Sequence, residues 1–138
     1  MKKASVIVVL LIVSNIVVAK TPDLQALLNN QVDAFNNQDI AKLVSNITDD
    51  MKYFYITSDE LIIETSGKAA FETAMINYFK SGRTPQSSIE STVIDGSRIS
   101  FKEVVSHINK EGETVSSSAM GIYQYRDDKI VRAWYFID

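Results

Sequence analysis

The sequence predicts a single α+β domain, in which helices come first and a long antiparallel meander follows. A length of 138 residues suits one domain. In the first part of the chain, apolar residues recur at intervals of three and four, as they do on one face of a helix. After Pro85 the chain has the features of strands joined by short turns, and no linker or repeat interrupts them.

Three helices are expected before the meander. The first begins at Thr21-Pro22-Asp23, where threonine can cap the helix and proline suits its first turn. Asp39 can cap a second, short helix. The third runs from Ser66-Gly67 to Ser81-Gly82, where glycine suits a left-handed end. The apolar positions are Leu24, Leu27, Leu28, Val32 and Phe35 in the first helix, Ile40, Leu43, Val44 and Ile47 in the second, and Phe71, Ala74, Met75, Tyr78 and Phe79 in the third.

Strands account for the rest of the domain. Asp49-Asp50 is expected to end the second helical pattern before the first strand begins. Asp95-Gly96 is a strong hairpin signal, and Asp127-Asp128 marks a tight turn before the last strand. The expected strands are residues 51–57, 59–65, 86–95, 98–108, 114–125 and 129–137.

The last strand is apolar on both faces. Its alternate residues are Ile130, Trp134 and Phe136 on one face and Val131, Ala133, Tyr135 and Ile137 on the other. An antiparallel sheet that is covered on one side only normally has polar residues on its outer side. We therefore expect a second copy of the chain to cover the outer sheet face, which gives a homodimer. The alternative is a mildly apolar surface that stays in contact with water.

Composition excludes several classes of function. The chain has 14 basic and 17 acidic side chains, which does not provide the basic surface that nucleic-acid binding requires. With no cysteine and one histidine, His107, a dedicated metal site is not expected. The sequence contains no glycine-rich phosphate loop, dinucleotide fingerprint or nucleophile elbow, so we expect no cofactor.

Residues 1–19 have the pattern of a signal peptide. Lys2 and Lys3 precede an apolar run of 16 residues that ends at the small residue Ala19, where cleavage is expected. The run is shorter than the ~20 residues of a membrane-spanning helix, although an uncleaved anchor is the alternative. We therefore expect a periplasmic or secreted protein, with a single domain at 20–138 and no membrane attachment after cleavage.

Three stretches, taken with the order of the elements, point to a known family. They are Asp33–Ile40 at the helix junction, Ser66–Phe71 at the start of the third helix, and Tyr125–Ile130 before the last strand. In these features the chain from Thr21 to Asp138 resembles the NTF2-like superfamily (cystatin-like cone fold), and within it the SnoaL-like and ketosteroid-isomerase-like group. The resemblance implies helices packed in the concave face of a strongly curved, mixed but mainly antiparallel sheet of about six strands. It also implies a conical apolar pocket and frequent dimerisation through the sheet.

The resemblance does not extend to ketosteroid isomerase activity. Those enzymes use a carboxylate base with a tyrosine and a protonated aspartate as oxyanion donors. The three positions fall on Tyr55, Gln31 and Gly121 in this chain, so none of the groups is kept. Polyketide-cyclase relatives carry an acid near the end of the last strand, where Asp138 is a candidate for catalysis. A chain terminus is usually solvated, however, which argues against a positioned acid or base.

Aromatic residues are the candidate ligand contacts. Tyr53 and Tyr55 alternate on the first strand, and Tyr123 and Trp134 lie in the last hairpin. Each could contact a ligand with its ring and polar atom, or could simply fill the core. The faces of Tyr123 and Trp134 depend on the length of the turn between them. His107 has the same ambiguity: it could line the pocket, or lie beside a turn without chemical role.

These observations leave three functions open. The first is binding of a small, largely apolar molecule in the conical pocket, without catalysis. The second is a cofactor-independent isomerase, cyclase or dehydratase in which His107 is the general base, because an imidazole titrates near neutral pH. The third is a structural homodimer without a ligand.

Overall fold

A computed structural model describes residues 21–82 and 84–137. The expected signal peptide at 1–19 and the candidate Asp138 lie outside the described residues. The elements are α1 (Leu24–Asn36), α2 (Ile40–Ser45), β1 (Ile47–Ile56), β2 (Leu61–Ser66), α3 (Lys68–Phe79), β3 (Gln86–Asp95), β4 (Arg98–Ile108), β5 (Thr114–Arg126) and β6 (Lys129–Phe136). Of the helices in this described part, none has the length and apolar character needed to cross a membrane.

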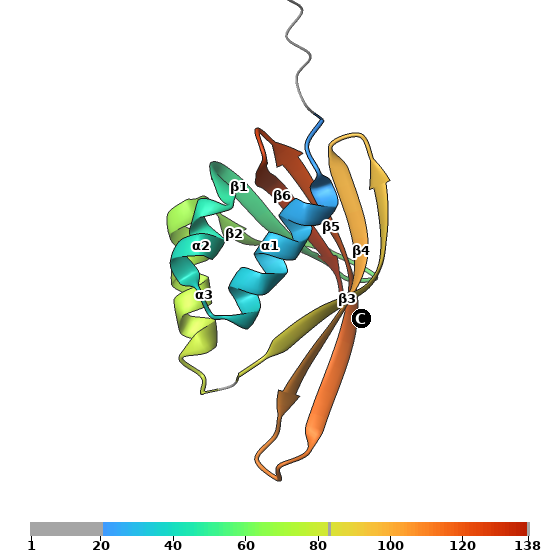
Figure 1. Cartoon of the computed structure of the whole chain (residues 1–138). Helices are drawn as coiled ribbons and strands as arrows, with labels where there is room; N and C mark the ends of the chain where they lie inside the picture. The colour runs from blue at the N-terminus through green and yellow to red at the C-terminus, as the bar shows by residue number, and fades with distance from the viewer. Residues whose placement is uncertain (1–20, 83, 138) are drawn as a thin grey trace, which may run out of the picture.

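The six strands form one mixed sheet with the order β2-β1-β6-β5-β4-β3. All neighbours are antiparallel except β1 and β6, which pair in parallel. Figure 1 shows that the sheet is strongly curved, that all three helices lie on its concave side, and that the β4–β5 hairpin extends beyond them. The predicted α+β architecture is therefore confirmed.

The residue that caps the N-terminus of each helix is an aspartate in α1 and α2 and a glycine in α3. Asp39 caps α2 as predicted, its carboxylate accepting a hydrogen bond from the backbone N–H of Lys42 at 2.9 Å. The cap of α1 is Asp23 and not Thr21, because the Asp23 carboxylate accepts from the N–H of Ala26 at 3.1 Å. The helix then starts at Leu24, which is buried. At the start of α3, Gly67 has a φ of +88°, a conformation that suits glycine.

Asp49 and Asp50 do not interrupt the structure as expected, because β1 already begins at Ile47. The pairing of β1 with β6 is irregular between Ile47 and Lys52, so the two acids lie on a stretch that leaves the regular ladder. Cations from neighbouring elements bind them: Lys68 contacts Asp49 at 2.9 Å, and Arg126 contacts Asp50 at 2.5 Å.

A β-bulge in β6 decides which side chains face the helices. Tyr125 pairs with Ile130 and Gln124 with Arg132, so Val131 is an extra residue without a direct partner. Alternation therefore restarts after Val131, and Ile130 lies on the same side as Ala133 and Tyr135. The prediction that Ile130 shares a face with Trp134 is wrong, because strict alternation does not allow for a bulge.

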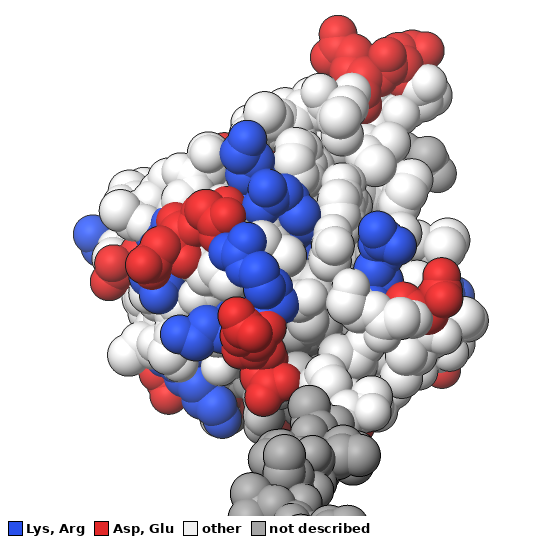
Figure 2. Space-filling model, turned by 90° about the horizontal axis from the view of Figure 1, so that it is seen from above, with Lys and Arg blue, Asp and Glu red and all other residues white. Residues whose placement is uncertain are grey.

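The core lies between the helices and the concave face of the sheet. Its fully buried side chains include Leu28, Leu43, Ile47, Met51 and Ile99. The outer surface, in contrast, carries acidic and basic side chains side by side over the view in Figure 2.

Candidate functional site

A cavity of about 260 Å³ lies between the helices and the concave face of the sheet. Most of its lining is aliphatic or aromatic. The polar side chains of the lining are Gln31, Tyr53, Tyr55, Tyr78, Glu103, Tyr123 and Tyr135. A largely apolar cavity with a few polar groups pointing into it is the usual form of a small-molecule site.

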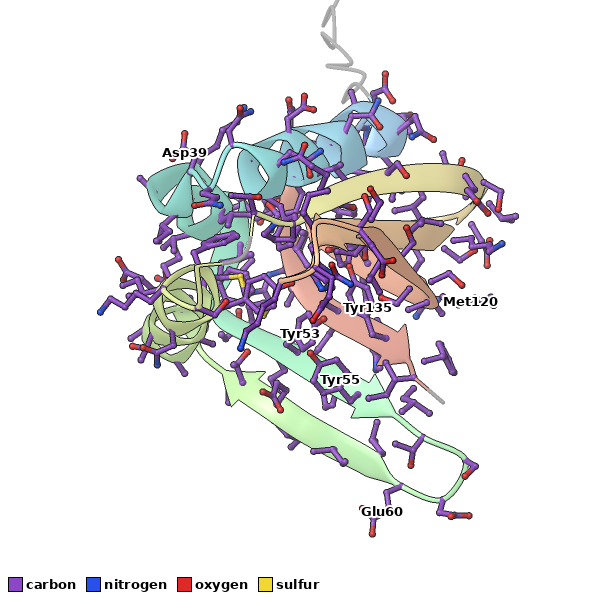
Figure 3. The ribbon with its side chains drawn as sticks, turned by 90° about the horizontal axis from the view of Figure 1, so that it is seen from below. Asp39, Tyr53, Tyr55, Glu60, Met120 and Tyr135 are labelled. Atoms are coloured by element: carbon purple, nitrogen blue, oxygen red, sulfur yellow. The ribbon has the colours of Figure 1, made fainter. Side chains whose placement is uncertain are left out.

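Four of the tyrosines come from three adjacent strands of the sheet, β1, β6 and β5. Alternation along β1 directs Tyr53 and Tyr55 to the concave side, while β5 supplies Tyr123 and β6 supplies Tyr135. Figure 3 shows Tyr53, Tyr55 and Tyr135 close together, whereas Met120 lies away from this group. The rings of Tyr53 and Tyr135 stack with centroids 5.3 Å apart, and Tyr55 meets Tyr53 edge-on at the same distance.

The tyrosine hydroxyls are neutral hydrogen-bonding groups. The hydroxyls of Tyr123 and Tyr135 are 2.9 Å apart and form a buried pair. Burial raises the pKa of Tyr53, Tyr123 and Tyr135 well above the usual range of a phenol, and the nearby negative charge of Glu103 raises the pKa of each further. Burial also raises the pKa of Tyr55. All four therefore keep their protons at neutral pH.

Glu103 is the one carboxylate among the described residues that line the cavity. The Ser87 hydroxyl donates a hydrogen bond to its Oε1 atom. Ser87 is buried, and the side-chain amide of Asn36 holds its backbone from two sides: Asn36 Nδ2 donates to the Ser87 carbonyl at 2.9 Å, and the Ser87 N–H donates to Asn36 Oδ1 at 2.6 Å. The carboxylate is thus tied through β3 to the end of α1, which fixes its position in the cavity.

Sequence reasoning did not single out Glu103 as a site residue. The signal was present, since Glu103 is an acid on a strand face that is otherwise formed by Ile99, Phe101 and Val105. The contact with Ser87 joins residues 16 positions apart, and the Asn36 contact spans 51 positions. Neither spacing is that of a recognisable motif, so the support of this carboxylate is visible only in the folded chain.

The predicted aromatic site residues lie on both faces of the sheet. Tyr53, Tyr55 and Tyr123 line the cavity. The structure places Trp134 on the opposite face of the sheet, where its ring stacks on Phe54 with centroids 5.8 Å apart. The two-residue turn at 127–128 and the bulge direct its neighbour Tyr135 inward instead.

His107 lies outside the cavity lining, whereas Gln31 and Gly121, which align with ketosteroid isomerase site residues, lie at or near the cavity. His107 is near the end of β4, where it pairs with Val115, and it is not among the residues that line the cavity. Gln31 lines the cavity and accepts a hydrogen bond from Asn46 Nδ2 at 2.9 Å. At Gly121 an added Cβ would lie 2.5 Å from the Phe101 ring, so that ring takes the space a side chain would need.

Comparisons with solved structures agree with the cone-shaped architecture. An LEH-like epoxide hydrolase from M. tuberculosis is 16% identical with a TM-score of 0.67, covering 82% of this chain and 80% of that one. IdmH from Streptomyces antibioticus, a proposed polyketide cyclase, is 14% identical with a TM-score of 0.69 and coverages of 83% and 91%. An NTF2-like protein of unknown function from Burkholderia pseudomallei is 11% identical with a TM-score of 0.69 and coverages of 86% and 92%.

At these identities the likeness shows the fold alone. No curated protein sequence matches the chain. A family model does: that of the SnoaL-like domain matches residues 28–133, most of the part that the structure describes. The resemblance seen in the sequence is thereby confirmed, and the chain belongs to the SnoaL-like domain family of the NTF2-like superfamily.

Proposed function

We propose that this protein binds a small, largely apolar molecule in the cavity between its helices and the concave sheet face. The observation that carries the proposal is the lining itself, in which aromatic and aliphatic side chains surround a few inward-pointing polar groups. The rings supply contact area, while the tyrosine hydroxyls and Glu103 orient the ligand by hydrogen bonds. The family assignment, and the likeness of fold to an epoxide hydrolase, support a small-molecule site.

A screen of lipophilic compounds by thermal shift tests this proposal. We expect at least one class of compound to raise the melting temperature, because a ligand that binds only the native state stabilises it. In Ala119→Phe, where the added ring points into the cavity, the rise should disappear. The matched control is Ser118→Phe, which places the same ring on the other side of β5 and should keep the response. A screen without any stabilising compound would contradict the proposal.

A second candidate function is proton-transfer catalysis, as in a cofactor-independent isomerase or cyclase. The observation that favours it is Glu103, a carboxylate held in place beside neutral phenols, which is a suitable arrangement for a general base and its oxyanion donors. Exchange of the α-protons of a cyclic ketone in D₂O, followed by NMR, tests it. Catalysed exchange that Glu103→Gln abolishes would support this function, and exchange at the uncatalysed rate would count against it.

We further propose that the chain is exported and forms a homodimer. Export is supported by the basic start, apolar run and small residue of positions 1–19, and the N-terminal sequence of the mature protein tests it. Dimerisation is supported by the apolar outer side of the sheet, which we call the convex face. It is formed by Phe54, Met120, Ile122, Trp134 and Phe136. Met120 and Phe136 are 57% and 42% exposed in the single chain.

A further inference from the structure

We infer that the ligand of the cavity is a cation: a small lipophilic amine whose ammonium group binds Glu103 among the tyrosine rings. This inference rests on the proposed binding function and adds the chemical class of the ligand to it. Three features of the cavity support it: its charge, the free side of the Glu103 carboxylate, and the arrangement of the aromatic rings.

The described part of the cavity lining carries one acidic group and no basic one. Among the described residues that line it, Glu103 is the acid, and lysine, arginine and histidine are absent. The ion pairs of the described chain lie elsewhere. Lys102, the neighbour of Glu103 in β4, points to the other side of the strand and pairs with Glu90 at 2.7 Å. A carboxylate in apolar surroundings without a cation is unfavourable, so a positively charged ligand gains more here than a neutral one.

The carboxylate also has a free side. Its Oε1 atom accepts the hydrogen bond from Ser87, whereas no hydrogen bond or ion pair from the described residues reaches Oε2. The backbone of Ser87 is held by Asn36, so the carboxylate is positioned before any ligand arrives. An ammonium group can donate a charge-assisted hydrogen bond to such an oxygen, and a preformed acceptor favours affinity.

The rings around Glu103 suit a cation as well. Among the rings that line the cavity, Tyr53 and Tyr135 form a stacked pair, and Tyr55 meets Tyr53 edge-on. The negative faces of aromatic rings attract ammonium groups within about 6 Å. An anionic ligand would meet the charge of Glu103 without any compensating base. The cavity therefore favours a cation over a neutral molecule, and a neutral molecule over an anion.

Three probes with one ring and different head groups test the inference: 2-phenylethylamine, 2-phenylethanol and phenylacetate. Binding is measured by isothermal titration calorimetry, and a panel of further amines with matched alcohols extends the comparison. We expect the amine to bind at least about tenfold more tightly than the alcohol, as a charge-assisted hydrogen bond in a buried site allows. Phenylacetate should bind least.

Glu103→Gln is the informative variant, because glutamine keeps the shape and an oxygen that can accept from Ser87. It should weaken amine binding about tenfold and weaken alcohol binding much less, because the alcohol carries no charge to pair with the carboxylate. Glu90→Gln is the matched control: it removes the same charge from the opposite side of the sheet and should leave both affinities unchanged. Melting curves of each variant confirm that it is folded.

The outcomes separate the inference from the proposed function. If the alcohols bind as tightly as the amines, or if Glu103→Gln leaves amine binding intact, the inference is wrong and the binding function stands. If no amine of the panel binds, the inference is wrong as well. In that case the lipophilic screen decides on the binding function independently.

Discussion

The two faces of the sheet are both rich in aromatic side chains, but they differ in what accompanies the rings. On the concave face most of the rings belong to tyrosines that are largely buried, and a carboxylate lies among them. On the convex face the rings are Phe54, Trp134 and Phe136, next to the aliphatic Met120 and Ile122. Polar atoms among buried rings suit a ligand that must be oriented, whereas an exposed apolar face suits packing against another protein surface.

The largest expected effect is on the free energy of unfolding, which should fall more when an aromatic ring is removed from the concave face than from the convex face. Phe101→Ala on the concave side should lower it by about 3–5 kcal/mol, because Phe101 is buried and contacts Tyr123 and Tyr135. Phe136→Ala on the convex side should lower it by about 1 kcal/mol, because this ring is partly exposed. Urea unfolding at a protein concentration low enough to keep the chain monomeric measures both. Equal losses would contradict the comparison.

Charges on the convex face should break the homodimer without unfolding the chain. Met120→Lys combined with Phe136→Lys should weaken association at least about tenfold, because two charges per chain would have to leave water in the interface. Sedimentation velocity over a range of concentrations measures this effect. The control is Ile94→Lys, an exposed apolar position on the edge strand β3 whose side chain lies on the other side of the sheet, opposite Ile99, and which should leave association unchanged. A wild-type chain that is monomeric at all concentrations would refute the dimer.

The hydroxyl pair of Tyr123 and Tyr135 should contribute about 1 kcal/mol, a smaller amount that is specific to the concave face. Tyr123→Phe or Tyr135→Phe alone should lower the free energy of unfolding by about that amount, since each leaves one buried hydroxyl without its partner. The double variant should lose no more than either single variant. Losses that simply add in the double variant would show that the two hydroxyls act independently.

The smallest effect is expected at Asp49 and Asp50, on the exposed irregular part of β1. Hydrogen bonds from Lys68 and Arg126, respectively, lower the pKa of these carboxyls below the usual range. Stability from the two pairs should therefore be complete above the pKa of an unfolded aspartate and be lost as the pH falls through the lowered values. Because both groups are exposed, the change should be slight and should diminish in high salt. Unfolding of wild type and Asp49→Asn between pH 7 and pH 2 checks the direction.

The architecture was largely predictable from the sequence because its signals are local. Helical spacing located α1, α2 and α3, and turn signals such as Asp95-Gly96 located the hairpins of the meander. The same reasoning failed at Asp49-Asp50, where two acids remain in a strand because Lys68 and Arg126 bind them from other elements. Such partners are distant in the sequence and cannot be read from the pattern.

The site was predictable in part. Tyr53, Tyr55 and Tyr123 follow from simple alternation and line the cavity. Trp134 and Tyr135 could not be assigned to a face, because the bulge at Val131 shifts the alternation by one residue. Glu103 acquires its role from Ser87 and Asn36, contacts that form only when β3 closes against β4 and the end of α1.

The extra residue at Val131 has a consequence beyond its own strand. Because of this bulge, the indole of Trp134 lies on the convex face and the phenol of Tyr135 lines the cavity, although the two residues are neighbours in the chain. If Val131 took a regular place in the ladder with β5, the two side chains would exchange faces without any change in the sequence. The polar character of the cavity and the apolar character of the convex face therefore both depend on the backbone geometry at one residue.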